Sequence, residues 1–192
     1  MFDGSGCTPW QETDPVAPLN YYGQSKLQGE QAIQASGCRH LIFRTSWVYG
    51  THGSNFAKTM LRLARERKKL RVIDDQIGAP SGADLLADVS ALALCSVIEN
   101  PVLAGIYHLA AAGEASWYDY ARFVIEQARA SGEMLAVNSI EAIPSSAYPT
   151  PARRPSNSRL DTRKLHERFA LHLPHWQDGV SRVLKEITGA HA

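Results

Sequence analysis

The spacing of apolar and polar residues predicts helices and strands that alternate along the chain. Apolar residues three or four positions apart indicate amphipathic helices, and short β-branched or aromatic runs indicate buried strands. We predict helices over residues 20–36, 54–67, 83–99, 116–130, 161–169 and 175–188. We predict strands over residues 40–45, 70–73 and 105–109. This alternation favours an α/β fold, although three or four strands are few for 192 residues.

Polar and flexible residues mark the ends of these elements. Asn20 and Ser116 stand where a short polar side chain can cap the first turn of a helix, and Gly37 ends the first helix. Residues 1–18 and the proline-rich residues 144–158 are predicted as loops. No internal repeat or low-complexity tract interrupts this order, so the α/β interpretation holds for the whole chain.

Composition and charge exclude several classes of function. An apolar share of 44% and a charged share of 20% are ordinary for a globular protein. A net charge of +1 gives no electrostatic reason to bind nucleic acid or an anionic membrane. Residues 85–98 form a nearly apolar run that is too short to span a bilayer, and residues 1–10 do not resemble a signal peptide. Three widely spaced cysteines predict neither a disulfide framework nor a metal cluster, so we expect a cytoplasmic protein.

The first predicted helix carries a tyrosine and a lysine four residues apart. Tyr22 and Lys26 share one helical face because positions i and i+4 are neighbours on a helix. A phenol is a weak acid catalyst at neutral pH unless its anion is stabilised, and a nearby ammonium does this. Such a pair can give a proton to a carbonyl oxygen while a hydride reaches the carbon. The same spacing also arises by chance on an exposed helix, so it does not establish catalysis alone.

Longer motifs surround this pair. They are FDGSG (2–6), PWQETD (9–14), PLNYYGQSKLQGE (18–30), HLIFRTSWVYG (40–50), NFAKTMLRLA (55–64), DDQIGAPSGADLLAD (74–88), AYPTPARRPSNSRLDT (147–162) and LPHWQDGV (173–180). In order and spacing the chain resembles the dTDP-4-dehydrorhamnose reductases, a family of the extended short-chain dehydrogenase/reductase superfamily. The resemblance covers essentially all 192 residues.

The resemblance implies a reaction and a set of site residues. The family reduces the 4-keto group of dTDP-4-dehydro-L-rhamnose with NADPH or NADH, which gives dTDP-L-rhamnose. Tyr22 would be the general acid, and Lys26 would support it and bind the nicotinamide ribose, so both would contact the cofactor. Trp47 would line the sugar pocket, although a loop aromatic can equally seal a core. Asn55 and Arg154 would meet the nucleotide end of the substrate, where an Arg fork suits a diphosphate.

Some members of the family carry a Mg²⁺ site at a homodimer contact. Asp84 and Glu186 stand at the matching positions, although the family more often has glutamate at the position of Asp84. Two carboxylates are by themselves more often surface charges. The resemblance therefore implies Mg²⁺ and a homodimer, besides the dTDP-sugar substrate, as partners to be tested.

The resemblance also implies a domain organisation. We expect the C-terminal part of a Rossmann-like parallel sheet plus a small C-terminal substrate-binding domain. Residues 1–75 would be the remainder of the Rossmann-like domain and carry the Tyr-x-x-x-Lys helix, and residues 76–192 would be mainly the substrate-binding domain, with an interleaved boundary. No glycine-rich turn follows a predicted strand. We therefore expect an N-terminally truncated reductase that lacks the dinucleotide-binding half and is inactive alone.

Two other functions stay open. The chain could be a non-catalytic binding or dimerisation fragment. It could also belong to an epimerase or dehydratase of the same superfamily that acts on another sugar nucleotide. The motif SWVYG followed by NFAKTMLRLA favours the reductase.

Overall fold

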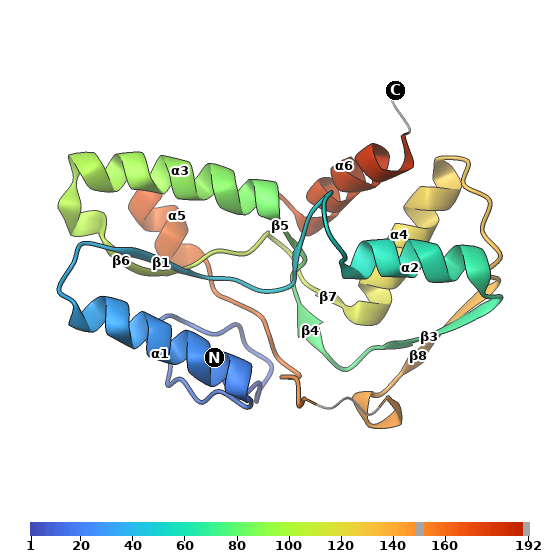
Figure 1. The fold of residues 1–192 in the computed structure, drawn as a ribbon, viewed down its shortest axis with the longest axis horizontal. Helices are drawn as coiled ribbons and strands as arrows, with labels where there is room; N and C mark the ends of the chain where they lie inside the picture. Colours follow the sequence, from blue (N-terminus) through green and yellow to red (C-terminus); the bar gives the residue numbers. More distant parts are fainter. Residues whose placement is uncertain (149–151, 190–192) are drawn as a thin grey trace.

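The computed structural model describes residues 1–148 and 152–189 of the chain (Figure 1). Its α-helices are α1 (Tyr21–Ala35), α2 (Phe56–Glu66), α3 (Ala83–Glu99), α4 (Trp117–Ala130), α5 (Arg163–Phe169) and α6 (Trp176–Thr188). Its strands are β1 (Leu41–Arg44), β2 (Val48–Tyr49), β3 (Lys69–Ile73), β4 (Ile77–Gly78), β5 (Ser81–Gly82), β6 (Gly105–His108), β7 (Ala115–Ser116) and β8 (Ser139–Ile143). Two 3-10 helices, η1 (Pro101–Leu103) and η2 (Ser145–Ala147), complete the described elements. None of the described helices has the length and apolar character needed to cross a membrane.

The strands form four separate pairs. β1 pairs with β6, β2 with β5 and β3 with β8 in parallel, whereas β4 and β7 are antiparallel. In Figure 1 the β1–β6 pair lies between α3 and α5 on one side and α1 on the other. The β3–β8 pair lies beside α2 and α4 in the other half of the molecule. The mixed α/β fold with parallel strands is therefore confirmed.

The predicted helices are all present, and their ends lie within a few residues of the prediction. The three predicted strands correspond to β1, β3 and β6. β8 was not predicted, because its sequence SIEAI has only two β-branched residues and places a glutamate among them. It becomes a strand by pairing over five residues with β3, a partner about seventy positions earlier in the chain. The two-residue strands were too short to leave a periodic signal.

Two hydrophobic clusters form the core, and they interleave along the sequence. The larger lies among α2, α4, α6 and β3 and includes Leu61, Val124 and Val180. The smaller joins β6, α3 and α5 through Tyr107, Val89 and other residues. The larger cluster draws buried residues from both sides of residue 75, and partly buried Leu41 and Phe43 pack against the smaller one from before that residue. The division into two domains at that residue stays a prediction.

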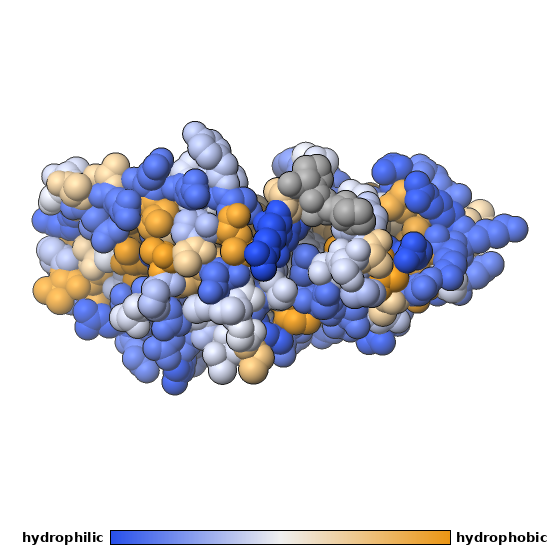
Figure 2. All heavy atoms as spheres, turned by 90° about the horizontal axis from the view of Figure 1, so that it is seen from below, coloured by the Kyte–Doolittle hydropathy of each residue, from blue (hydrophilic) through white to orange (hydrophobic). Residues whose placement is uncertain are grey.

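Helix α1 is attached to the rest of the molecule by a few contacts. Gly23 and Glu30 are its only buried residues, whereas Tyr21, Tyr22 and Ile33 are exposed. The carboxylate of Glu30 accepts hydrogen bonds of 2.8–3.2 Å from Arg44 of β1. Seen from below, apolar side chains show between polar ones on the half of the molecule that holds α1 and the β1–β6 pair (Figure 2). One buried ion pair therefore fixes much of the orientation of this helix.

Candidate functional site

The structure brings Tyr22 and Lys26 together in the first turns of α1. The Asn20 side chain caps this helix by accepting a hydrogen bond from the backbone N–H of Gly23 at 2.9 Å. The Lys26 ammonium lies 5.3 Å from the centroid of the Tyr22 ring, within the range of a cation–π contact. Tyr22 is 70% exposed, so its hydroxyl is accessible. The predicted proximity is present, and the catalytic roles of the two residues stay predictions.

The segment that carries Arg154 lies beside the start of this helix. The Asn20 side chain donates a hydrogen bond of 3.0 Å to the backbone carbonyl of Arg153. One position beyond Arg154, Pro155 approaches Gly4 so closely that a Cβ at Gly4 would lie 2.4 Å from the Cβ of Pro155. Gly4 also has a φ of +73°, a conformation that favours glycine. Arg154 itself is exposed, on a segment that the Asn20–Arg153 hydrogen bond places at the start of α1 and that Pro155 places against the N-terminal loop.

A buried asparagine ties the N-terminal loop to the chain after Arg154. Asn157 is 2% exposed and donates hydrogen bonds to the carbonyls of Ser5 at 3.3 Å and Thr8 at 2.8 Å. Trp10 adds a backbone hydrogen bond of 3.0 Å from its N–H to the carbonyl of Arg159. The two loops therefore form one unit at the capped end of α1.

Trp47 lies in the loop before β2 and has a left-handed backbone, with a φ of 49°. Its indole is stacked on that of Trp117, with ring centroids 3.7 Å apart and an angle of 12° between the planes. Trp117 is the first residue of α4 and was not singled out from the sequence. No local pattern could have paired two residues seventy positions apart, and the only signal near Trp117 is the helix cap Ser116 before it.

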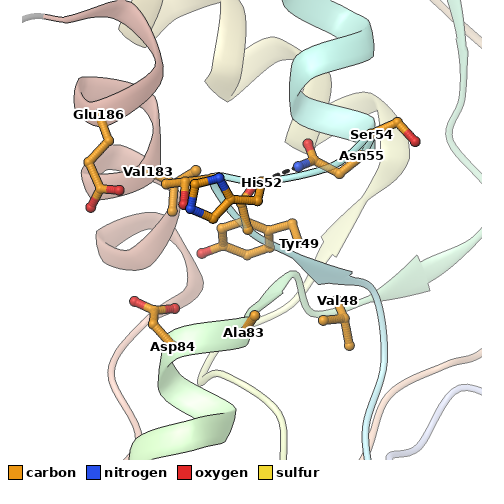
Figure 3. A pocket seen from close by; sticks show the side chains of 11 residues that line it. Val48, Tyr49, His52, Ser54, Asn55, Ala83, Asp84, Val183 and Glu186 are labelled. Atoms are coloured by element: carbon orange, nitrogen blue, oxygen red, sulfur yellow. Dashed lines mark hydrogen bonds between the residues drawn. The ribbon is translucent and has the colours of Figure 1, made fainter.

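Three other predicted site residues meet at a different place. A cavity of about 360 Å³ is lined by residues from the β2–α2 loop, the start of α3 and α6 (Figure 3). Asn55, Asp84 and Glu186 all face it, and Trp47 does not line it. The side-chain Oδ1 of Asn55 caps α2 by accepting a hydrogen bond from the Lys58 N–H at 3.1 Å, and its side-chain Nδ2 donates to the Gly50 carbonyl at 2.7 Å. Asn55 therefore shapes the loop that forms one wall.

The carboxylates of this cavity do not form a metal site in the described residues. Asp84 forms an ion pair with Arg182 of α6, so its charge is already neutralised. Residues 1–148 and 152–189 contain no group of three or more His, Cys, Asp or Glu side chains placed to hold a metal ion. The predicted Mg²⁺ site at Asp84 and Glu186 therefore finds no support. The shorter side chain of Asp84 and its arginine partner are the physical reasons.

Burial shifts the protonation of two aromatic groups, Tyr49 at this cavity and His108 in β6. Desolvation raises the pKa of Tyr49 to about 12, although the neighbouring Arg182 opposes the rise. Burial lowers the pKa of His108, against the attraction of the Glu12 carboxylate, and Arg44 lowers it further. Tyr49 therefore keeps its proton and His108 stays neutral at pH 7. Tyr49 lines the cavity and was not singled out from the sequence.

Comparison with known sequences finds dTDP-4-dehydrorhamnose reductases among the proteins similar to this chain. The dTDP-4-dehydrorhamnose reductase of Escherichia coli (strain K12) is 58% identical over 187 residues, which are 97% of this chain and 62% of that relative. The reductase of Salmonella typhimurium is 56% identical over 187 residues, with the same coverage. The chain therefore spans about 62% of the length of these relatives.

Solved structures of dTDP-4-dehydrorhamnose reductases are also similar to this chain. A dTDP-4-dehydrorhamnose reductase from Clostridium acetobutylicum superposes with a TM-score of 0.86 at 30% identity, over 97% of this chain and 62% of that one. The reductase of Bacillus anthracis, solved in complex with NADP, gives a TM-score of 0.83 at 33% identity, over 96% of this chain and 62% of that one. A UDP-glucose 4-epimerase from Thermus thermophilus, at 20% identity, shares the fold with a TM-score of 0.72, over 96% of this chain and 59% of that one. The family model described as RmlD substrate binding domain matches residues 1–188, and the chain belongs to that family.

Proposed function

We propose that this chain is the substrate-binding and proton-donating part of an enzyme that reduces dTDP-4-dehydro-L-rhamnose to dTDP-L-rhamnose. The observation that carries the proposal is the contact between Tyr22 and Lys26, at 5.3 Å, in a chain of this family. The identity of 58% to a dTDP-4-dehydrorhamnose reductase supports the choice of substrate. The epimerase likeness, at 20% identity, supports the fold alone.

The proposed chemistry follows from what the two side chains can do. The Tyr22 hydroxyl donates a proton to the 4-keto oxygen of the sugar as the carbonyl carbon is reduced, so the ketone becomes an alcohol. The Lys26 ammonium beside the ring stabilises the phenolate that remains on Tyr22. Capping of α1 by Asn20 holds the two groups in the same orientation toward the substrate.

A reduced nicotinamide dinucleotide is the cofactor that the proposal needs. When bound, it supplies the hydride that the carbonyl carbon accepts. Within residues 1–148 and 152–189, neither the Tyr22 hydroxyl nor the Lys26 ammonium is hydrogen-bonded to the chain, and both side chains are exposed. These two groups fit the hydroxyls of a nicotinamide ribose and would hold that end of the cofactor. NADP bound to the Bacillus anthracis relative supports this choice of cofactor.

The substrate would lie between α1 and the loops that face it. Arg154 is exposed beside the capped end of α1, where its guanidinium can bind the diphosphate in a bidentate manner. Trp47 would form a wall for the sugar ring. Asn55 would act by shaping the loop of residues 50–55, since its own amide is occupied within the chain. The homodimer stays a prediction.

The proposal is tested by restoring the part of the Escherichia coli relative that this chain does not match. A chimera joins that part to residues 1–192, and NADPH oxidation is followed by its near-ultraviolet absorbance with dTDP-4-dehydro-L-rhamnose as substrate. We expect turnover by the chimera and a loss of about a hundredfold or more in kcat for Tyr22→Phe.

Tyr21→Phe is the matched control, because Tyr21 is the neighbouring tyrosine and is 84% exposed. It should leave kcat unchanged. Equal rates for Tyr22→Phe and Tyr21→Phe would refute the assignment of Tyr22 as the acid. Conversion of a sugar nucleotide to its epimer or dehydration product without net oxidation of NADPH, detected by chromatography of the products, would favour the epimerase or dehydratase alternative.

A further inference from the structure

We propose that Trp117 is a positioning residue for Trp47, and that it holds the Trp47 indole in the orientation that receives the sugar end of a nucleotide sugar. The inference rests on the proposed function and adds to it a residue that acts through another. It is carried by the contacts around the two indoles, each of which restricts their movement.

The backbone of Trp47 needs outside support. A φ of 49° is in the left-handed region, which bulky residues rarely adopt. The Trp47 carbonyl accepts a hydrogen bond from the Ser81 N–H at 3.2 Å, which fixes the peptide after the ring. A strained residue persists only where surrounding contacts hold it, and such residues cluster at ligand sites.

The ring of Trp47 is held by Trp117. With centroids 3.7 Å apart and planes 12° from parallel, the two indoles are stacked face to face. Aromatic pairs prefer offset or edge-to-face arrangements, so neighbouring contacts must maintain this one. Rotation of Trp47 about its side-chain bonds would require Trp117 to move as well.

Trp117 is itself anchored on two sides. Its Nε1–H donates a hydrogen bond of 3.2 Å to the side-chain oxygen of Gln76, which is 7% exposed. The Phe56 ring lies 4.6 Å from it, at an angle of 49°. Trp117 also follows directly after Ser116, which forms a capping box with Asp119. These contacts make Trp117 the fixed member of the pair.

Gly78 also lies against the Trp47 ring and limits its movement. A Cβ at Gly78 would lie 2.8 Å from Cε2 of Trp47, and 3.0 and 3.1 Å from Nε1 and Cζ2. Cε2 is bonded to both Nε1 and Cζ2 and lies behind the ring edge that these two atoms form. A Cβ that is nearest to Cε2 therefore approaches the face of the ring and not its edge. Trp117 and Gly78 both lie against the ring, and Trp47 is only half-buried, so part of the ring stays accessible to a sugar.

The test measures the binding of dTDP-L-rhamnose to the 192-residue chain by titration calorimetry, with thermal melting and near-ultraviolet circular dichroism on each variant. Trp117→Leu removes the stacking partner, Trp117→Phe keeps a smaller ring, and Gly78→Ala places a methyl group against the Trp47 ring. Trp176→Phe is the control, because Trp176 is 3% exposed in the same cluster and packs on Phe123 and Tyr120, with no ring contact to Trp47 or Trp117 among the described residues.

We expect Trp117→Leu and Gly78→Ala each to raise Kd about tenfold, and Trp117→Phe to restore part of the affinity. The circular dichroism couplet of the stacked indoles should disappear in Trp117→Leu and persist in Trp176→Phe, whose Kd should not change. If Trp117→Leu folds and binds like wild type, or if Trp176→Phe loses as much affinity, the positioning role is wrong while the proposed function stands. If Trp117→Leu does not fold, an unchanged Kd in Gly78→Ala refutes the role. Absence of binding by the wild-type chain would overturn both proposals.

Discussion

Removing the buried carboxylate of Glu30 should destabilise the protein far more than removing a carboxylate from a surface ion pair. The Arg44 and Glu30 side chains are only 9% and 10% exposed, and three N–H···O contacts of 2.8–3.2 Å join them. Loss of one partner leaves the other charge buried and unpaired, which costs about 3–5 kcal/mol of the free energy of unfolding. Because α1 has only two buried residues, it can detach locally, and we expect the lower end of this range.

The comparison pair is Arg62 and Glu66, which lie on the surface of α2 with side chains 61% and 51% exposed. An exposed pair of this spacing contributes about 0.3–0.5 kcal/mol. Urea unfolding of Glu30→Ala and Glu66→Ala, followed by circular dichroism, therefore separates the two cases. Hydrogen exchange should also show lost protection of the α1 amides in Glu30→Ala alone.

A double replacement tests the cause of the loss. Glu30→Leu combined with Arg44→Met removes both charges, so no unpaired ion remains, and most of the lost stability should return. The reasoning is refuted if Glu30→Ala costs no more than Glu66→Ala. It is also refuted if the double replacement is as unstable as Glu30→Ala.

Two further predictions concern the N-terminal loop beside α1, through the buried His108 that Phe2 contacts and through Gly4 within the loop. His108 is fully buried with a lowered pKa, so the unfolded chain binds its proton near the ordinary value of 6.5 while the folded chain does not. The contribution of His108 to stability should therefore be complete above that pH and be lost as the pH drops below it. Urea unfolding at several pH values should show a smaller loss of the free energy of unfolding in His108→Gln than in the wild-type chain. Equal losses in the two proteins would contradict this prediction. Gly4→Ala should destabilise the chain by more than about 1 kcal/mol, because it adds a clash with Pro155 to the backbone strain. Gly6→Ala is the control, since Gly6 has a similar φ of +70° and no atom within 4 Å of a Cβ, and similar melting temperatures for the two variants would show that the clash is absent.

The parts of the fold that follow from local pattern were predictable. Helix α2 carries a clear apolar stripe, and Asn55 stands at its start as a capping residue, so its position could be read from the sequence. Strand β8 could not, because it depends on pairing with β3 from a distant part of the chain. The strand pairs around Trp47 are two residues long, and tertiary contacts alone define them.

Within the candidate site, too, features set by local spacing were predictable, and features set by tertiary contacts were not. The proximity of Tyr22 and Lys26 follows from helical spacing, and the structure has it. The stack of Trp47 on Trp117 was not predictable, since it needs α4 to fold against the loop before β2. The carboxylates of Asp84 and Glu186 do face one cavity, but no local pattern indicates that Arg182, about a hundred positions later, would neutralise Asp84.

Calorimetric titration of the chain with dTDP-L-rhamnose and with UDP-galactose tests the central claim most directly. The claim is that these residues recognise the dTDP-sugar substrate of a reductase. We predict measurable binding of dTDP-L-rhamnose, with UDP-galactose at least about tenfold weaker, a difference of about 1.4 kcal/mol. No binding of dTDP-L-rhamnose, or tighter binding of UDP-galactose, would contradict the account.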